Sequence, residues 1–117
     1  MKYFATMSEG KVSNNTEHTS IELLSAENGC RDGCCSGISI YYCINYSTAS
    51  CHEDQEGFFV LEGYGWARVG DEEFKLEPEI SFIVPAGVNH CIKSNSSSCP
   101  VKVLWFHSAI LDKELFL

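Results

Sequence analysis

The chain of 117 residues has a mass of 13.0 kDa, a formal net charge of -8 at pH 7 and a sequence pI near 4.8. A chain of this length forms one domain, which buries on the order of two-thirds of the surface of its unfolded form. The chain is acidic and has no cluster of Lys or Arg. Its charge therefore argues against nucleic acid and anionic membrane surfaces as partners.

The first 24 residues are mostly polar. Residues 1–9 have no long apolar run behind Lys2, so they lack the form of a secretory signal. No segment is apolar over a length that spans a bilayer. We therefore expect a cytoplasmic protein. Residues 10–20 predict a loop or a loosely held edge in which His18 is solvated, and residues 21–24 predict an edge strand.

Seven cysteines are the most unusual feature of the composition, and three of them lie in the glycine-rich stretch 28–37. Their odd number and the missing export signal predict reduced thiols. One interpretation makes Cys30, Cys34 and Cys35 a soft-metal or redox site, although their spacing matches no zinc-binding pattern. The other interpretation, which we favour, is a glycine-rich loop whose small thiols are incidental.

From residue 38 onward, short stretches rich in β-branched and aromatic residues are separated by turn signals, with almost no helical period. This pattern predicts an all-β sandwich or barrel. We expect an N-terminal extension with an edge strand over residues 1–37, a barrel core over 38–110 and a C-terminal tail over 111–117. The expected strands cover residues 38–46, a strand pair along 58–68, and residues 73–76, 80–84, 90–92 and 101–107.

Two stretches carry residues that suit a metal site. His52 and Glu56 stand four residues apart before an apolar run, and His90 follows a Pro-Ala-Gly turn. In one straight strand, His52 and Glu56 would lie roughly 13 Å apart, too far to share an ion. The polar residues 53–55 therefore have to turn the chain, so that His52 ends one strand and Glu56 begins the next. The alternative is that both are surface residues of a polar loop.

The alternation of side chains along a strand predicts which residues border this site. Phe58 and Val60 share the face of Glu56, and Ile92 shares the face of His90. We expect these three side chains to line a pocket at the metal.

Three further residues near these strands have less certain positions. Cys51 and Cys91 each stand next to a ligand histidine, so the same alternation points them away from the site. His107 shares a face with Trp105. It either borders the pocket or is a surface or core-edge histidine, which is the commoner case.

The two stretches resemble the two sequence motifs of the cupin family, over roughly residues 38–107. The first motif runs glycine, five residues, His-x-His, three or four residues, glutamate, six residues, glycine. His52, Glu56 and Gly63 match its second histidine, its glutamate and its closing glycine. The second motif runs glycine, five residues, Pro-x-Gly, two residues, histidine, three residues, asparagine, and its matching residues are Pro85, Gly87 and His90.

Four positions depart from the motifs. Ser50 stands where the first histidine should be, Ile44 and Glu79 replace the two leading glycines, and Ser94 replaces the asparagine. What is left is a set of two histidines and one carboxylate, which suits non-haem Fe(II) and could also hold Mn, Ni or Zn.

The resemblance implies a double-stranded β-helix, the cupin jelly-roll barrel, with the metal pocket in its mouth. It also implies a small-molecule ligand and a homodimer. In one hypothesis His52, Glu56 and His90 hold a cation whose open positions take an oxygen-bearing metabolite or O₂, as in dioxygenase, decarboxylase or sugar-isomerase cupins, with Ser50 lining the pocket and holding a bound water. A second hypothesis is a non-catalytic binding module with a degenerate site. A third is a thiol sensor of oxidants or soft metals.

Overall fold

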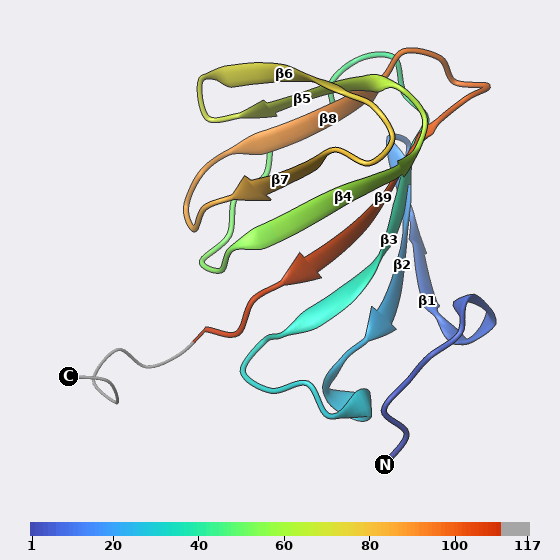
Figure 1. Cartoon of the computed structure of the whole chain (residues 1–117), viewed down its shortest axis with the longest axis vertical. Helices are drawn as coiled ribbons and strands as arrows, with labels where there is room; N and C mark the ends of the chain where they lie inside the picture. The colour runs from blue at the N-terminus through green and yellow to red at the C-terminus, as the bar shows by residue number, and fades with distance from the viewer. Residues whose placement is uncertain (111–117) are drawn as a thin grey trace.

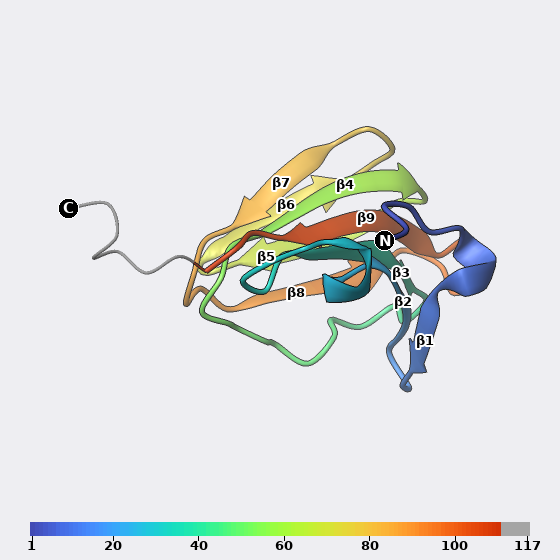
Figure 2. The ribbon, with the colours of Figure 1, turned by 90° about the horizontal axis from the view of Figure 1, so that it is seen from below.

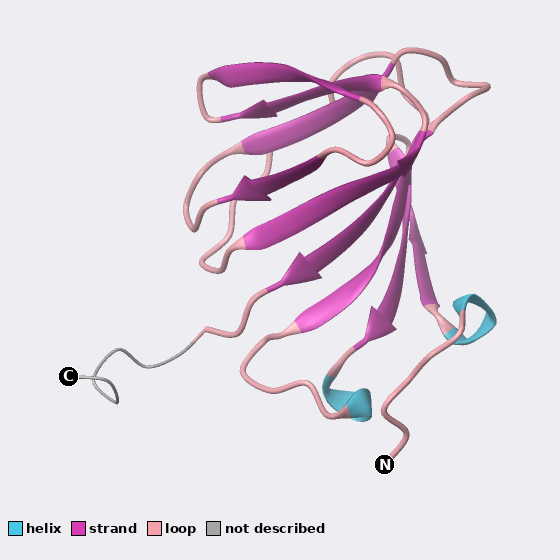
Figure 3. Cartoon of the chain, viewed as in Figure 1, coloured by secondary structure: helices cyan, strands magenta, loops and turns pink. Residues whose placement is uncertain are grey.

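The structure is a computed structural model that describes residues 1–110, and its regular secondary structure is almost entirely antiparallel strands in two sheets (Figures 1 and 3). The larger sheet contains six strands in the order β1-β2-β3-β9-β4-β7, and the smaller contains three in the order β6-β5-β8. Two single-turn 3-10 helices, η1 and η2, flank the first two strands. The elements are η1 (Met7–Glu9), β1 (Lys11–Asn14), β2 (His18–Leu24), η2 (Ala26–Asn28), β3 (Cys35–Tyr41), β4 (Glu56–Glu62), β5 (Gly65–Val69), β6 (Glu72–Leu76), β7 (Ser81–Val84), β8 (His90–Ser94) and β9 (Val101–His107).

The two sheets share one apolar core, and Figure 2 shows their strands from below. Strand β9 shows why, because Val101, Val103 and Trp105 are buried whereas Leu104 and Phe106 between and beyond them are exposed. This two-residue period places one face of the strand against the other sheet. The buried cluster draws on both sheets and consists of Phe58, Val60, Ala67, Leu76, Val84, Ile92, Val101, Val103 and Trp105. The predicted all-β single domain is therefore confirmed.

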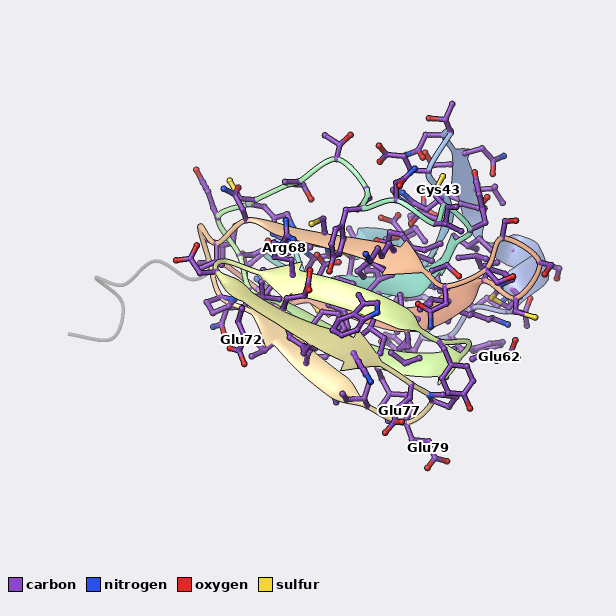
Figure 4. The ribbon with its side chains drawn as sticks, turned by 90° about the horizontal axis from the view of Figure 1, so that it is seen from above. Cys43, Glu62, Arg68, Glu72, Glu77 and Glu79 are labelled. Atoms are coloured by element: carbon purple, nitrogen blue, oxygen red, sulfur yellow. The ribbon has the colours of Figure 1, made fainter. Side chains whose placement is uncertain are left out.

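The outer face of the larger sheet is also apolar in part. Side chains from β4, β7 and β9 that alternate with the core residues point to solvent, and Phe59 lies opposite Leu104 in the sheet register. We call this set the outer apolar face; it consists of Phe59, Leu61, Ile83, Leu104 and Phe106. The ends of the strands are more polar, and Glu77 and Glu79 point away from the sheets in the turn between β6 and β7 (Figure 4).

Three expectations about local structure differ from what is observed. Residues 10–20, expected to be loop or loose edge, form β1 and the start of β2, which add a hairpin to the larger sheet. The predicted strand over 38–46 ends at Tyr41, and its continuation is an irregular segment. No strand ends at His52, since residues 42–55 form only a single bridge, between Ser50 and His90.

The predicted tail over 111–117 lies outside the described residues. In the described part of the chain, the search for a helix long and apolar enough to cross a membrane finds none.

Candidate metal centre

Four segments meet at one end of the sheets and bring histidines and carboxylates together. Glu56 is the first residue of β4 and His107 is the last residue of β9. Because these strands are antiparallel neighbours, the two residues are direct partners in the register. His90 begins β8 in the smaller sheet, and His52 lies in the loop that leads into β4.

The buried carboxylate of Glu56 is the centre of the cluster. Its side chain is only 9% exposed, and its Oε1 lies 3.1 Å from Nε2 of His52 and 3.2 Å from Nε2 of His90. Its other oxygen, Oε2, lies 3.3 Å from Nε2 of His107. Three imidazoles from three different segments therefore turn the same ring nitrogen toward one carboxylate.

Asp54 lies on the opposite side of two of these rings. Its Oδ1 is 2.9 Å from Nδ1 of His52, and its Oδ2 is 2.9 Å from Nδ1 of His107. The Asp54 side chain is 12% exposed, so both contacts are largely shielded from water. His52 and His107 each stand between two carboxylates, with Nδ1 toward Asp54 and Nε2 toward Glu56.

The spacing of these atoms fits a metal ion. Ligand atoms at about 2.1 Å from one ion, at tetrahedral or octahedral angles, are separated by roughly 3.0–3.4 Å. The set His52, Glu56 and His90 offers ligand atoms that all lie within 4.8 Å of one another, and so does the set His52, Asp54 and His107. Imidazole and carboxylate donors together suit Fe, Mn, Ni or Zn. The cluster could therefore hold a divalent cation.

The cluster opens into a cavity of about 260 Å³ whose remaining wall is rich in hydroxyl groups. His18 stacks on Tyr41 there, with ring centres 4.7 Å apart. Burial lowers the pKa of His18 and raises the pKa of Tyr41. Trp105 also borders the cavity, and its buried Nε1 has no hydrogen-bond partner among the described residues. The lining consists of His18, Ser20, Ser39, Tyr41, Ser47, Thr48, Ser50, His52, Glu56, His90, Cys91, Trp105 and His107.

The four residues expected to border the metal divide into two groups. Ser50 lines the cavity, held there by its bridge to His90. Phe58, Val60 and Ile92 instead belong to the apolar core and are at most 2% exposed. Strand alternation gives the correct face, but these side chains lie further between the sheets than the ligands do. The ring centre of Phe58 lies 6.0 Å from that of His90.

Two other expectations are corrected by the cavity wall. Cys91, expected to point away from the site, is buried and borders the cavity. The reason is that the segment before Ser50 runs along β8, with Ser47 N–H donating to the carbonyl of Ile92 at 3.0 Å. His18, expected to be solvated, is half-buried on the same wall.

The cysteine-rich stretch contains no comparable cluster. Burial raises the pKa of Cys35 to about 11 and also raises the pKa of Cys30. Cys34 is exposed. Within residues 1–110, the groups of His, Cys, Asp and Glu that are close enough to hold a metal include no cysteine. Raised thiol pKa values oppose the thiolate form that redox and metal chemistry need.

Sequence reasoning missed Asp54 and left His107 undecided. The alternation of Val101, Val103 and Trp105 already placed His107 on the inner face of its strand. The missing information was the pairing of that strand with β4, which sets His107 beside Glu56.

The geometry agrees with a comparison against families of known proteins. The model of the cupin domain matches residues 46–107, which is more than half of the chain. The chain belongs to the cupin family. The predicted family is thereby confirmed, and the matched residues include the three motif positions His52, Glu56 and His90 as well as His107. No curated protein sequence matches this cupin significantly.

Solved structures support the same fold. The Fe(II) form of HppE has a TM-score of 0.75 at 16% identity, over 88% of this cupin and 58% of that chain. The Cnp3 cupin domain of Schizosaccharomyces pombe has a TM-score of 0.74 at 15% identity, over 90% and 72%. Oxalate decarboxylase of Bacillus subtilis, a protein with Mn(II) centres, has a TM-score of 0.75 at 13% identity, over 97% and 32%. This cupin thus spans little more than half of the HppE chain and a third of the decarboxylase.

Proposed function

We propose that this cupin holds one divalent cation through His52, Glu56 and His90 and uses it to bind a small oxygen-bearing metabolite. The observation that carries the proposal is the approach of two Nε2 atoms to Oε1 of one buried carboxylate, at 3.1 and 3.2 Å. Buried carboxylates are costly unless they are paired or coordinate a metal. The Fe(II) and Mn(II) of two structural relatives make these metals the first candidates.

The bound cation would supply Lewis acidity and a template that orients the ligand. The residues of the chain supply the rest. Among residues 1–110, neither Lys nor Arg lines the cavity, so this part of the wall offers no ammonium or guanidinium group to a phosphate or phosphonate. Its hydroxyl groups and the unpartnered Nε1–H of Trp105 instead suit the oxygens of a hydroxy or carbonyl compound. Reactions of the dioxygenase, decarboxylase or sugar-isomerase type would use such a ligand.

Elemental analysis of protein purified without an affinity tag tests the metal assignment. We expect about one divalent cation per chain, and loss of that cation in His90→Ala. His18→Ala is the matched control, because His18 lines the same cavity but is not one of the described histidines that pair with Glu56. Unchanged metal content in His90→Ala would refute the proposal.

A second candidate function is a binding module without catalysis. Ser50 in place of the first motif histidine favours it, because the cavity persists although one imidazole of the motif is absent. A Ser50→His variant distinguishes the two candidates. Metal in the variant alone would point to a binding module whose metal site has lapsed, whereas metal in both proteins supports a working centre.

We further propose that the cupin forms a homodimer through the outer apolar face. Five apolar side chains gather there, each 37–51% exposed, and apolar patches of this kind mark interaction surfaces. Light scattering should give the mass of two chains, and Phe106→Lys should reduce it to one. A monomeric mass for the unchanged protein would refute the dimer.

A further inference from the structure

We infer that His107 supplies the imidazole that Ser50 does not, and that Asp54 is the positioning residue that turns both His52 and His107 toward the metal. The inference rests on the proposed function and adds two residues to it. It replaces a site of two histidines and one carboxylate by a site of three histidines and one carboxylate.

His107 lies beside Glu56 because of strand pairing. The start of β4 and the end of β9 are paired, so the backbone itself holds His107 beside Glu56. The Nε2 of His107 lies 3.3 Å from Oε2 of Glu56, much like the 3.1 and 3.2 Å of the two motif histidines from Oε1. Glu56 thus has Nε2 of His52 and of His90 beside one carboxylate oxygen and Nε2 of His107 beside the other, and these residues would hold the cation. The ring of His107 also packs edge-on against the ring of His52, with ring centres 4.9 Å apart, so both rings belong to one cluster.

Asp54 contacts the rings of both His52 and His107. Its Oδ2 forms a hydrogen bond with Nδ1 of His107 at 2.9 Å. Its Oδ1 lies 2.9 Å from Nδ1 of His52, an ion-pair contact without hydrogen-bond geometry. A histidine that donates its Nδ1–H to a carboxylate keeps the lone pair on Nε2, which is the atom that binds a metal. Asp54 thus selects this tautomer in His107 and aims its lone pair at Glu56. The carboxylate also lies 2.9 Å from Nδ1 of His52, on the side of that ring away from Glu56.

The alternative role for Asp54 is that of a ligand. His52, Asp54 and His107 also satisfy the spacing of a metal site, but that ion would sit on the Nδ1 side. His52 would then serve two ions through its two nitrogens, or the ion at Glu56 would lose it. The convergence of three Nε2 atoms on Glu56 favours one ion there, with Asp54 behind the rings.

Titration of metal-free protein with Mn(II) alone, followed by electron paramagnetic resonance, tests both roles. Mn(II) prefers carboxylate and imidazole to thiolate, so the seven cysteines interfere little. The variants are His107→Gln and Asp54→Asn. The matched control is His18→Gln, which makes the same change at a cavity histidine that is not one of the two described in contact with Asp54. Thermal melting of the metal-free variants checks that each folds.

We expect one Mn(II) per wild-type chain. His107→Gln should weaken binding at least about tenfold and change the spectrum of the bound ion, because a ligand is lost. Asp54→Asn should weaken binding by about 10–100-fold with the stoichiometry kept at one, as found when outer partners of metal-bound histidines are removed. His18→Gln should bind like wild type.

Several results would overturn the inference. If His107→Gln binds Mn(II) as wild type does while His90→Gln does not, the proposed function stands and His107 is no ligand. Two Mn(II) per wild-type chain would make Asp54 a ligand of a second ion. Equal losses in His107→Gln and His18→Gln would mean a general effect on the cavity. No Mn(II) in wild type would remove the proposed function itself.

Discussion

The histidine and carboxylate cluster and the cysteine-rich stretch invite comparison, because both gather metal-binding residue types. Cys30, Cys34 and Cys35 are close in sequence, yet two of them have raised pKa values and the third is exposed. The cluster around Glu56 draws on β4, β8, β9 and one loop, and its atoms converge within hydrogen-bond distance. A site in a β fold is made by the register of separate strands, and sequence proximity alone does not make one.

The largest contrast should appear in metal affinity. Glu56→Gln removes the charge on which three imidazoles converge, so it should weaken Mn(II) binding by more than the about 10–100-fold expected for an outer-shell residue. The triple variant in which Cys30, Cys34 and Cys35 become Ser should bind Mn(II) unchanged. Calorimetric titration of both proteins measures the difference. Weakened Mn(II) binding in the triple variant would contradict this prediction and indicate that the cysteines are ligands.

Two glycines of the stretch 28–37 extend the comparison to stability. A methyl group at Gly37 would lie 2.2 Å from the backbone oxygen of Ile21 and 2.5 Å from the ring of Trp105. Gly37→Ala should therefore lower the free energy of unfolding by about 1–3 kcal/mol or more. At Gly33 a methyl group meets nothing within 4 Å, although φ is +90°, so Gly33→Ala should cost about 1 kcal/mol.

Urea unfolding of the two alanine variants measures these costs. The order matters more than either value, since Gly37 supports the cavity wall through Trp105 and Gly33 lies in the open loop. Equal costs would show that backbone strain, and not the close approach of the strands, decides both.

Thiol reactivity should separate the cysteines by burial. At about pH 8, a thiol reagent should modify the exposed Cys34, Cys51 and Cys99 in the native protein. Cys35 should react much more slowly, because its pKa is raised to about 11 and few thiolates are present. Its rate should rise as the pH approaches that value. Mass spectrometry of digested samples assigns each site, and rapid modification of Cys35 at neutral pH would revive the thiol-sensor hypothesis.

The smallest expected effect concerns His18, a cavity histidine outside the cluster. Burial lowers its pKa in the fold, so the unfolded chain takes up the proton first as the pH falls below about 6.5. His18 therefore contributes stability above that pH, which is lost on acidification. Between about pH 7.5 and 5.5, the melting temperature of metal-free His18→Gln should fall less than that of wild type. Parallel falls in both proteins would contradict this.

The sequence predicted the fold and three members of the cluster because both depend on local patterns. Stretches of β-branched and aromatic residues between turn signals identified most strands. Motif spacing selected His52, Glu56 and His90. The position of His107 beside Glu56 depends on which strands become neighbours, and the position of Asp54 depends on how the loop before β4 folds. Neither leaves a mark in its own segment. The sequence also did not predict that Phe58 lies in the core and not at the metal pocket. Alternation shows which face of the strand a side chain lies on, but it does not show how far the side chain lies from the site.

The bridge at Ser50 has a consequence for how such a site can change over time. Ser50 N–H donates to the carbonyl of His90 at 3.1 Å, and His90 N–H donates back to the carbonyl of Ser50 at 2.9 Å. The structural contribution of position 50 is therefore made by its main chain, which any residue except proline can provide. Its side chain is free to drift while the loop that carries His52 stays in register with His90. A cupin barrel can in this way exchange the side chain at position 50 and still keep this loop paired with β8.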